Sequence, residues 1–381
     1  MNKVAIVFNT NKLGGAERSM LLQLSTLNRN DLCFYLPKSQ PGGVEKEIER
    51  LNLGFVTYYN YPKALYLLSR SNFFFSVFSL LEIFLFLLLD KSLSSLENYD
   101  VVYLNGNKAA FLFFFKHILK TWKGRIVWHL RDYFYQSFLT NLVWSVLLYG
   151  KKVEIVCNSF SVKNDLNASV FSKQRKTVIY NPSGLKLKAR KLQSLENIGF
   201  VSMMAPWKGV HEMIFFAWLY ECELKALGIK KISIYGDNLY ETQGEHRNYK
   251  EDLKKMINKF PSTLISFEGM QTPEKIFSEI DCLIHHSLER EPFGRVIIEG
   301  MDAHIPVVTT GLGGAGELVA NGVDGLIIPP YHRAELFNNI KKLVTDQVLR
   351  EQIILNGDVK AHSIQMDISK QIAAIINEAI S

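Results

Sequence analysis

The chain has 381 residues, of which 48% are hydrophobic and 21% are charged. This length suits two domains better than one, and the composition excludes an intrinsically disordered chain. The net charge of +7 is unevenly spread: residues 1–185 hold 22 basic and 12 acidic side chains, whereas residues 186–381 hold 22 and 25. A basic N-terminal half favours a polyanion or an anionic membrane surface as partner. Its basic residues are not interleaved with aromatic ones, so we expect no nucleic-acid partner.

The first apolar run, residues 4–8, is too short for the hydrophobic region of a signal peptide and reads as a strand, so we expect a cytoplasmic protein. Comparable apolar runs alternate with helix-like segments, and the pattern restarts after residue 195. It predicts two α/β domains with parallel sheets, at 1–182 and 183–366, joined near the Tyr-Asn-Pro-Ser-Gly segment at 180–184. The expected strands are 4–8, 100–105, 125–130, 153–159 and 177–181, then 198–203, 231–236, 264–269, 282–287, 306–310 and 325–330.

Three N-terminal stretches, 73–89, 109–115 and 133–149, are unusually apolar. The first is at the short limit for a membrane span, but a span there would separate the first strand from the rest of its domain. We expect helices that lie on the bilayer or dip into it; the alternative is buried packing helices. The basic side chains expected at the interface are Lys63, Arg70, Lys91, Lys116, Lys120 and Lys123.

Residues 291–299 (Glu-Pro-Phe-Gly-Arg-Val-Ile-Ile-Glu) place two carboxylates eight residues apart across a Pro-Phe-Gly break. Pro292 suits the first turn of a helix, which would leave the next backbone N–H groups as donors at a positive helix end. Those donors belong to Phe293, Gly294 and Arg295. Glu291 would lie beside them and Glu299 about two turns into the helix, so that one carboxylate can face a sugar hydroxyl and the other a ribose. The alternative is an i,i+4 surface ion pair between Arg295 and Glu299.

Two further loops have the composition of phosphate-binding segments. Residues 309–317 follow an expected strand and are rich in glycine, including Gly313 and Gly314, so their backbone amides can approach phosphate oxygens. Lys208, in Ala-Pro-Trp-Lys-Gly at 205–209, precedes an apolar helix. The helix dipole disfavours a lysine there unless an anion such as a diphosphate is held as well. The alternative is a solvated loop lysine.

Together these motifs resemble the family-4 retaining glycosyltransferases with the GT-B fold, and the similarity covers nearly the whole chain. In the N-terminal half it rests on Gly14-Gly15-Ala16-Glu17, His129, Asn158-Ser159 and Tyr180-Asn181-Pro182. In the C-terminal half it rests on Pro206-Trp207-Lys208-Gly209, Tyr235-Gly236-Asp237, residues 291–299, and Gly313-Gly314 with Glu317. The resemblance implies two Rossmann-like domains facing a cleft, with a last helix within 367–381 that crosses back to the first domain.

The resemblance also implies roles for single residues. Lys208 would bind the donor diphosphate, Glu299 the ribose, and Glu291 the donor sugar together with the amides of Phe293, Gly294 and Arg295. Gly14 and Gly15 would let the N-terminal loop approach the diphosphate and the acceptor, and Gly313 and Gly314 would line the donor site. His129 would lie near the donor sugar; the alternative is a satisfied core histidine. The catalytic set is Glu291, Lys208 and His129.

One position departs from the family pattern: Met203 stands where an arginine commonly supplies a second phosphate cation. Arg295, Arg18, Lys12 or Arg131 would then have to substitute, or activity would be low. No Asp-x-Asp motif and no Cys/His cluster with metal-ligand spacing occurs, so we expect neither a metal nor another cofactor. Lys208, helix N-termini and loop amides would neutralise the departing diphosphate.

The predicted partners are a nucleotide-diphosphate sugar and a lipid-linked or polysaccharide acceptor, as in lipopolysaccharide synthesis, at the inner face of the cell membrane. Two alternatives stay open. One is a soluble transferase of the same fold that acts on a small acceptor, and the other is a non-catalytic nucleotide-sugar-binding protein, with Met203 as a sign of decay.

Overall fold

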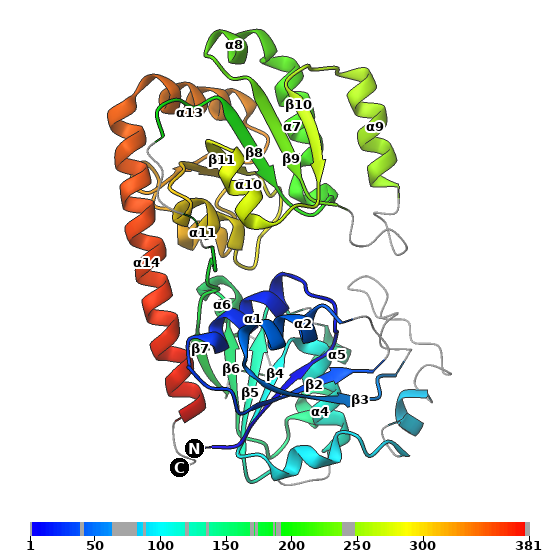
Figure 1. Ribbon diagram of the computed structural model, residues 1–381. Helices are drawn as coiled ribbons and strands as arrows, with labels where there is room; N and C mark the ends of the chain where they lie inside the picture. Colours follow the sequence, from blue (N-terminus) through cyan, green and yellow to red (C-terminus); the bar gives the residue numbers. More distant parts are fainter. Residues whose placement is uncertain are drawn as a thin grey trace. The chain divides into compact units, whose positions relative to one another are not determined.

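The computed structural model divides into two compact units, Met1–Pro182 with Met366–Ser381, and Ser183–Gln365 (Figure 1). It describes residues 2–38, 42–62, 82–86, 89–118, 122–134, 137–167, 171, 174–185, 187, 192–237 and 248–377. Each unit is an α/β domain built on one parallel sheet, as the alternating apolar runs predict.

The sheet of the N-terminal unit has the strand order β3-β2-β1-β4-β5-β6-β7. Its strands are β1 (Val4–Phe8), β2 (Leu32–Pro37), β3 (Gly54–Tyr59), β4 (Val101–Asn105), β5 (Arg125–Leu130), β6 (Val153–Cys157) and β7 (Arg175–Val178). Every residue of β1, β4 and β6 is buried, because helices cover both faces of a parallel sheet. Strands β2 and β3 are absent from the strands expected above. Strand β3 is only partly buried, and its Phe55 is 70% exposed.

The helices of this unit are α1 (Gly15–Ser25), α2 (Val44–Leu51), the short η2 (Ser94–Asn98), α4 (Asn107–Lys116), α5 (Phe138–Leu147) and α6 (Phe160–Asn167). An aromatic cluster joins α5 to the sheet, with Trp144 stacked on Trp128 of β5 at a centroid distance of 4.5 Å. Phe114 of α4 packs edge-on against both indoles. The apolar residues of α4 and one face of α5 therefore belong to the core.

The sheet of the C-terminal unit has the order β10-β9-β8-β11-β12-β13. Its strands are β8 (Asn197–Val201), β9 (Lys231–Tyr235), β10 (Ile265–Gly269), β11 (Cys282–His285), β12 (Val307–Thr309) and β13 (Leu326–Ile327). Its helices are η3 (Pro206–Lys208), α7 (Val210–Leu219), α8 (Glu221–Ala226), α9 (Tyr249–Lys259), α10 (Pro273–Glu279), α11 (Arg295–Asp302), α12 (Ala315–Leu318) and α13 (Arg333–Thr345). A separate hydrophobic core lies between this sheet and its helices.

The last helix, α14 (Gln347–Asn377), begins in the C-terminal unit and ends in the N-terminal one. Near its end, the Asn2 side chain donates to the Ile376 carbonyl at 3.2 Å and Arg125 donates to the Ile375 carbonyl at 2.8 Å. The expected return of the last helix to the first domain is therefore confirmed, although the helix begins twenty residues earlier than 367.

The three unusually apolar stretches differ from one another. Most of 73–89 lies outside the described residues, as do Lys63, Arg70 and Lys120. In 109–115 the expectation of a membrane-surface helix is wrong, because the side chains of α4 fill the core. Helix α5 has a buried apolar face and, in addition, exposes the apolar side chains of Phe138, Leu142 and Val146. Among the residues that the structure describes, no helix has both the length and the hydrophobicity to cross a bilayer.

Candidate functional site

The C-terminal sheet reverses its winding direction between β8 and β11. From β8 the chain proceeds to β9 and β10 on one side, and from β11 to β12 and β13 on the other. Ligands of open α/β sheets bind at such a switch point, outside the carboxyl ends of the strands. The segments that leave β8, β11 and β12 there carry the three motifs predicted from sequence: 205–209 follows β8, the motif 291–299 begins in the segment after β11, and the glycine-rich loop 309–317 begins at the end of β12.

An ion pair joins the first two of these segments. The Lys208 ammonium donates to the Glu291 carboxylate, and both side chains are largely buried, with 13% and 12% of their surfaces exposed. The ammonium also lies 4.2 Å from the centre of the Trp207 ring, in a cation–π contact. Lys208 is thus held in place, and the alternative of a solvated loop lysine is wrong.

Backbone hydrogen bonds connect the same segments to the glycine-rich loop. Glu291 donates its N–H to the Leu312 carbonyl at 3.0 Å and accepts the Gly314 N–H at 2.7 Å. Leu288 donates to the Trp207 carbonyl at 2.8 Å. Segments about 80 residues apart in sequence therefore meet around Glu291. Because the Gly314 N–H is engaged by Glu291, the loop binds this motif directly, and a further bond from that amide to a phosphate would have to replace the present one.

The chain must turn sharply between Lys208 and helix α7. Gly209 caps that helix with φ of +78°, in the left-handed region that favours glycine. A Cβ atom at this position would lie 2.5 Å from the carbonyl oxygen of His286, which belongs to the segment after β11. Glycine is therefore required both by the backbone conformation and by the close approach of the two segments.

Helix α11 begins later than the Pro-Phe-Gly break predicts. Its first residue is Arg295 and its N-cap is Gly294, with φ of +88°, so Pro292 precedes the helix instead of starting it. The left-handed glycine makes the turn that the sequence reading assigned to proline. Glu299 consequently lies about one turn into the helix, not two, and Phe293 is buried with 2% of its surface exposed. The first N–H groups of α11 still lack intrahelical acceptors, as at any helix N-terminus.

Arg295 and Glu299 form the i,i+4 ion pair considered from sequence, with 3.1 Å between Nε and Oε1. The pair does not lie on the surface, since 20% of the arginine side chain and 6% of the glutamate side chain are exposed. Arg295 is therefore paired through Nε, whereas its buried Nη1 has no hydrogen-bond partner within the described residues.

Three polar residues complete the surroundings of Glu291, and two of them, His285 and Ser287, lie outside the motifs predicted from sequence. Ser287 donates to its carboxylate at 2.9 Å, and His285 Nε2 lies 3.7 Å from the same oxygen. Thr309 holds the other nitrogen of His285 at 2.9 Å. Burial alone would raise the pKa of Glu291, but the charge of Lys208 and the hydrogen bond and charge of His285 hold it well below its usual range. Glu291 is therefore a carboxylate at neutral pH.

The expected N-terminal residues lie at the carboxyl ends of their own sheet. Gly14 is the N-cap of α1, and its N–H donates to the Glu17 carboxylate at 3.2 Å in a capping-box arrangement. A Cβ on Gly14 would crowd that carboxylate at 2.8 Å, whereas one on Gly15 would meet open space. A larger residue at Gly14 would therefore require only a shift of the Glu17 carboxylate, and one at Gly15 would require no shift.

His129, near the end of β5, is fully buried. Its Nδ1 is 2.8 Å from the Tyr103 hydroxyl, whereas its Nε2 has no hydrogen-bond partner within the described part of the chain. Burial and the neighbouring charge of Arg131 lower the pKa of His129, so the ring is neutral. Arg131 itself donates to Asn105 and to Asn181, at 3.1 and 2.6 Å. The histidine is therefore only partly satisfied by the protein.

Comparison with known proteins agrees with this geometry. Residues 188–359 match the family of glycosyl transferases group 1. The matched region contains Lys208, the Glu291–Glu299 motif and the glycine-rich loop. An uncharacterized glycosyltransferase of Methanocaldococcus jannaschii is 29% identical over 208 residues, which are 54% of this chain and 53% of that protein. The capsular polysaccharide biosynthesis glycosyltransferase CapM of Staphylococcus aureus is 25% identical over 224 residues, 54% of this chain and 55% of CapM. The chain thus spans about half the length of the curated relatives it matches.

Solved structures extend the likeness to the whole chain. Anabaena HepE, crystallised with UDP and glucose, has a TM-score of 0.77 at 22% identity, with 100% of both chains covered. OtsA, a trehalose-6-phosphate synthase, has a TM-score of 0.74 at 14% identity, with 99% of both chains covered. At these identities the likeness concerns the fold, and the two parallel-sheet domains are of the GT-B type predicted from the sequence.

Proposed function

We propose that this protein is a metal-independent, retaining glycosyltransferase that uses a nucleotide-diphosphate sugar as donor. The observation that carries the proposal is the convergence of Lys208, Glu291 and the glycine-rich loop at the switch point of the C-terminal sheet. A cation, a carboxylate and a helix N-terminus within one small region suit a ligand that has both a diphosphate and sugar hydroxyls. The group 1 family match over this region supports the same conclusion.

The two members of the ion pair have complementary roles in the proposed donor binding. An ammonium group has three N–H donors, and Lys208 uses one of them on Glu291, so two stay available for phosphate oxygens. Glu291, ionised at neutral pH, accepts hydrogen bonds from hydroxyls of the donor sugar. The pair thus orients the lysine before the donor arrives, which reduces the reorganisation needed on binding.

In the proposed reaction the acceptor hydroxyl oxygen forms a bond to the anomeric carbon while the bond from that carbon to the diphosphate oxygen breaks. The acceptor proton passes to the departing phosphate oxygen on the same face, so the configuration is retained and no protein nucleophile is required. Lys208 stabilises the charge that develops on the leaving group. NMR of the product's anomeric centre tests this route, and an inverted product would exclude it.

The proposed acceptor is a lipid-linked or polysaccharide chain at the inner face of the membrane. Helix α5 supports it with an exposed apolar face: Phe138 is 86% exposed, Leu142 51%, Val146 52%, and Tyr149 just beyond the helix 85%. Spacings of four, four and three residues place these side chains along one line of a helix. Leaving them in water is unfavourable, and insertion into a lipid interface would remove them from it. The net basic charge of residues 1–185 favours an anionic surface.

A thermal-shift screen tests donor binding. UDP-sugars come first, because HepE was crystallised with UDP and with UDP-glucose, and GDP-, ADP- and dTDP-sugars follow. One nucleotide should raise the melting temperature of the wild type by mass action, and Lys208→Met should abolish most of that rise. A control, Lys255→Met, removes an exposed lysine and should show the same rise in melting temperature as the wild type. Donor binding without transfer to any acceptor would favour the alternative of a non-catalytic binding protein.

Sedimentation with anionic vesicles tests the membrane proposal. The triple variant Phe138→Ser, Leu142→Ser, Val146→Ser should lose vesicle binding. A matched control, Leu355→Ser with Val359→Ser, removes comparably exposed apolar side chains (63% and 61%) from α14 and should bind as the wild type does. If the wild type itself stays in solution at low salt, the acceptor is better sought among small soluble sugars.

A further inference from the structure

Helix α4 begins at the carboxyl end of β4, the central strand of the N-terminal sheet. Its N-cap is Gly106, with φ of +90° and ψ of 171°, a conformation that favours glycine. Among the described residues, a Cβ atom on Gly106 would meet only the Asn9 side chain, at 3.5 Å, so the space before the helix is otherwise open. The first helical bond runs from the Ala110 N–H to the Gly106 carbonyl. The N–H groups of the three residues before Ala110 therefore have no acceptor within the helix.

The charges at this helix end are positive. Gly106 provides no side-chain cap, and the first turn of α4 contains no acidic residue. It contains a lysine instead: Lys108, the second residue of the helix, is half-buried. The helix dipole disfavours a cation at this end, and burial lowers the pKa of the Lys108 ammonium. Within the described residues, no carboxylate forms an ion pair with Lys108.

A buried amide directly before the helix lacks an acceptor, and this observation is independent of the helix end. Asn105, the last residue of β4, is 1% exposed, and its Oδ1 accepts from Arg131 Nε at 3.1 Å. Because a guanidinium can only donate, the orientation of the amide is fixed and Nδ2 carries its N–H groups. Within the described part of the chain this nitrogen has no partner, and neither has Nε2 of His129, the register partner of Asn105 in β5. A ligand oxygen would remove the cost of a buried donor without an acceptor.

We propose that this end of α4 binds a phosphate group of the acceptor through the first N–H groups of the helix, the Lys108 ammonium and the Asn105 amide. A phosphate has several acceptor oxygens and a negative charge, whereas the fixed groups here are donors and a cation. The neighbouring amides of Asn9 and Asn107 have no hydrogen bond within the described residues that fixes their orientation, so each can turn its nitrogen to the ligand. The inference rests on the proposed function, because it names the chemical class of the acceptor in the same transfer reaction.

The position of this site favours the acceptor over the donor as the source of the phosphate. The donor diphosphate is assigned above to Lys208 and the glycine-rich loop of the C-terminal sheet, whereas α4 begins at the N-terminal sheet. Helix α4 packs on α5, with 6.2 Å between the ring centres of Phe114 and Trp144, and α5 exposes the apolar side chains proposed to enter a membrane. The phosphate is either that of a lipid diphosphate carrying the acceptor sugar or that of a soluble sugar phosphate.

Binding is measured by calorimetry and thermal shift with three probes: inorganic pyrophosphate, geranyl diphosphate and glucose 1-phosphate. The full chain carries Lys208→Met throughout, so that the proposed donor site does not contribute. We expect one equivalent of a phosphate probe to bind and to raise the melting temperature by several degrees. Adding Lys108→Met should weaken this binding by at least about tenfold. Lys152→Met, which removes an exposed lysine from the same unit, should leave it unchanged.

Two variants distinguish a ligand site from a structural lysine. Asn105→Asp keeps an oxygen for Arg131 but replaces the free donor by a second anionic oxygen, so it should abolish binding while the protein stays folded. Without ligand, Lys108→Met should raise the melting temperature, because it removes a half-buried cation from a positive helix end. A loss of affinity without a loss of stability is the combination that a structural lysine cannot give.

The outcomes separate this site from the donor site and the two phosphate sources from each other. With Lys208 intact, Lys108→Met should keep the full rise in melting temperature caused by a UDP-sugar, so either site can fail without the other. A response to geranyl diphosphate but not to glucose 1-phosphate supports the site with a lipid anchor as source, and the reverse supports it with a soluble acceptor. Binding of none of the three probes, or unchanged affinity after Lys108→Met, would overturn the proposal.

Discussion

The Lys208–Glu291 pair gives the sharpest prediction. Lys208→Met keeps most of the side-chain volume but leaves a carboxylate without its cation where only 12% of the side chain is exposed. Breaking a buried ion pair by removing one member typically costs about 3–5 kcal/mol. Ser287 and His285 still contact Glu291, so we expect the lower value, about 3 kcal/mol in the free energy of unfolding. For a unit of this size that corresponds to a fall in melting temperature of roughly 6–12 °C.

The pH dependence identifies the cause of this loss. In the wild type the pKa of Glu291 is lowered, so its contribution to stability is present above the unfolded pKa and is lost only as the pH falls through the lower folded value. Without Lys208, only His285 opposes the effect of burial on Glu291, so we expect the pKa of Glu291 to rise above the unfolded value and stability to fall as the pH rises above that value. The deficit of Lys208→Met should therefore be larger at pH 7 than at pH 5.

Urea unfolding of four proteins at the two pH values completes the test. The double variant Lys208→Met, Glu291→Gln should recover part of the deficit, because no uncompensated charge is left. Lys255→Met breaks an exposed pair with Asp252 and should cost less than about 0.5 kcal/mol. A deficit below about 1 kcal/mol for Lys208→Met, or one that does not change with pH, would refute the reasoning.

Three further predictions concern Gly209 and His286, near the Lys208–Glu291 pair, and Tyr103 in the N-terminal unit. Gly209→Ala should destabilise the protein by about 2–3 kcal/mol in urea unfolding, because strain adds to the clash with the neighbouring carbonyl; Gly228→Ala, with a similar φ of +89° and open space, should cost about 1 kcal/mol. Burial, with nearby positive charges, lowers the pKa of His286 to about 4. The stability of the wild type should therefore decrease as the pH is lowered from 6.5 to 4. His286→Asn should remove that part of the decrease from a profile of melting temperature against pH. Tyr103→Phe should cost about 1–2 kcal/mol, since it deprives the buried His129 of its hydrogen bond; an unchanged unfolding midpoint would contradict this.

Much of the fold was predictable because its signals are local. The fully buried strands of a parallel sheet are continuous apolar runs, and most of those expected from sequence coincide with observed strands to within two or three residues. Strand β3 was not predicted; Gly54 and Thr57 interrupt its apolar run, and the strand is only partly buried. The stretch 109–115 has a strong apolar signal, but that signal does not say what the helix packs against. Hydrophobicity all round a helix is equally consistent with a core and with a membrane, and only its neighbours distinguish the two.

The candidate site was predictable in its residue types but less so in its geometry. A Pro-Phe-Gly sequence indicates a break, but which residue makes the turn depends on backbone dihedral angles, and Gly294 makes it instead of Pro292. His285 and Ser287 carried no recognisable motif. They became part of the site only because β11 lies beside β8 and β12, so that its last residue and the following loop surround Glu291.

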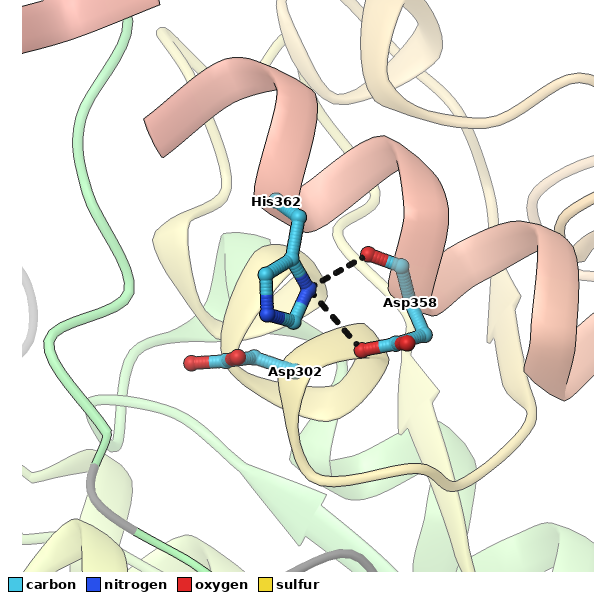
Figure 2. Close-up of side chains that lie close together, drawn as sticks. All are labelled: Asp302, Asp358 and His362. Atoms are coloured by element: carbon cyan, nitrogen blue, oxygen red, sulfur yellow. Dashed lines mark hydrogen bonds and ion pairs between the residues drawn. The ribbon is translucent and has the colours of Figure 1, made fainter. Parts of the chain in front are cut away.

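By itself the sequence determined that the chain folds into two α/β domains and that a lysine, two glutamates and a glycine-rich loop belong to its C-terminal half, since these are properties of composition and of short-range order. Tertiary structure alone decided that Lys208 forms an ion pair with Glu291 and that the side chain of Asp302 lies close to those of Asp358 and His362 (Figure 2). The physical reason is distance along the chain: 83 and 56 residues separate these partners, and no local pattern records a contact that only the packing of separate strands and helices creates.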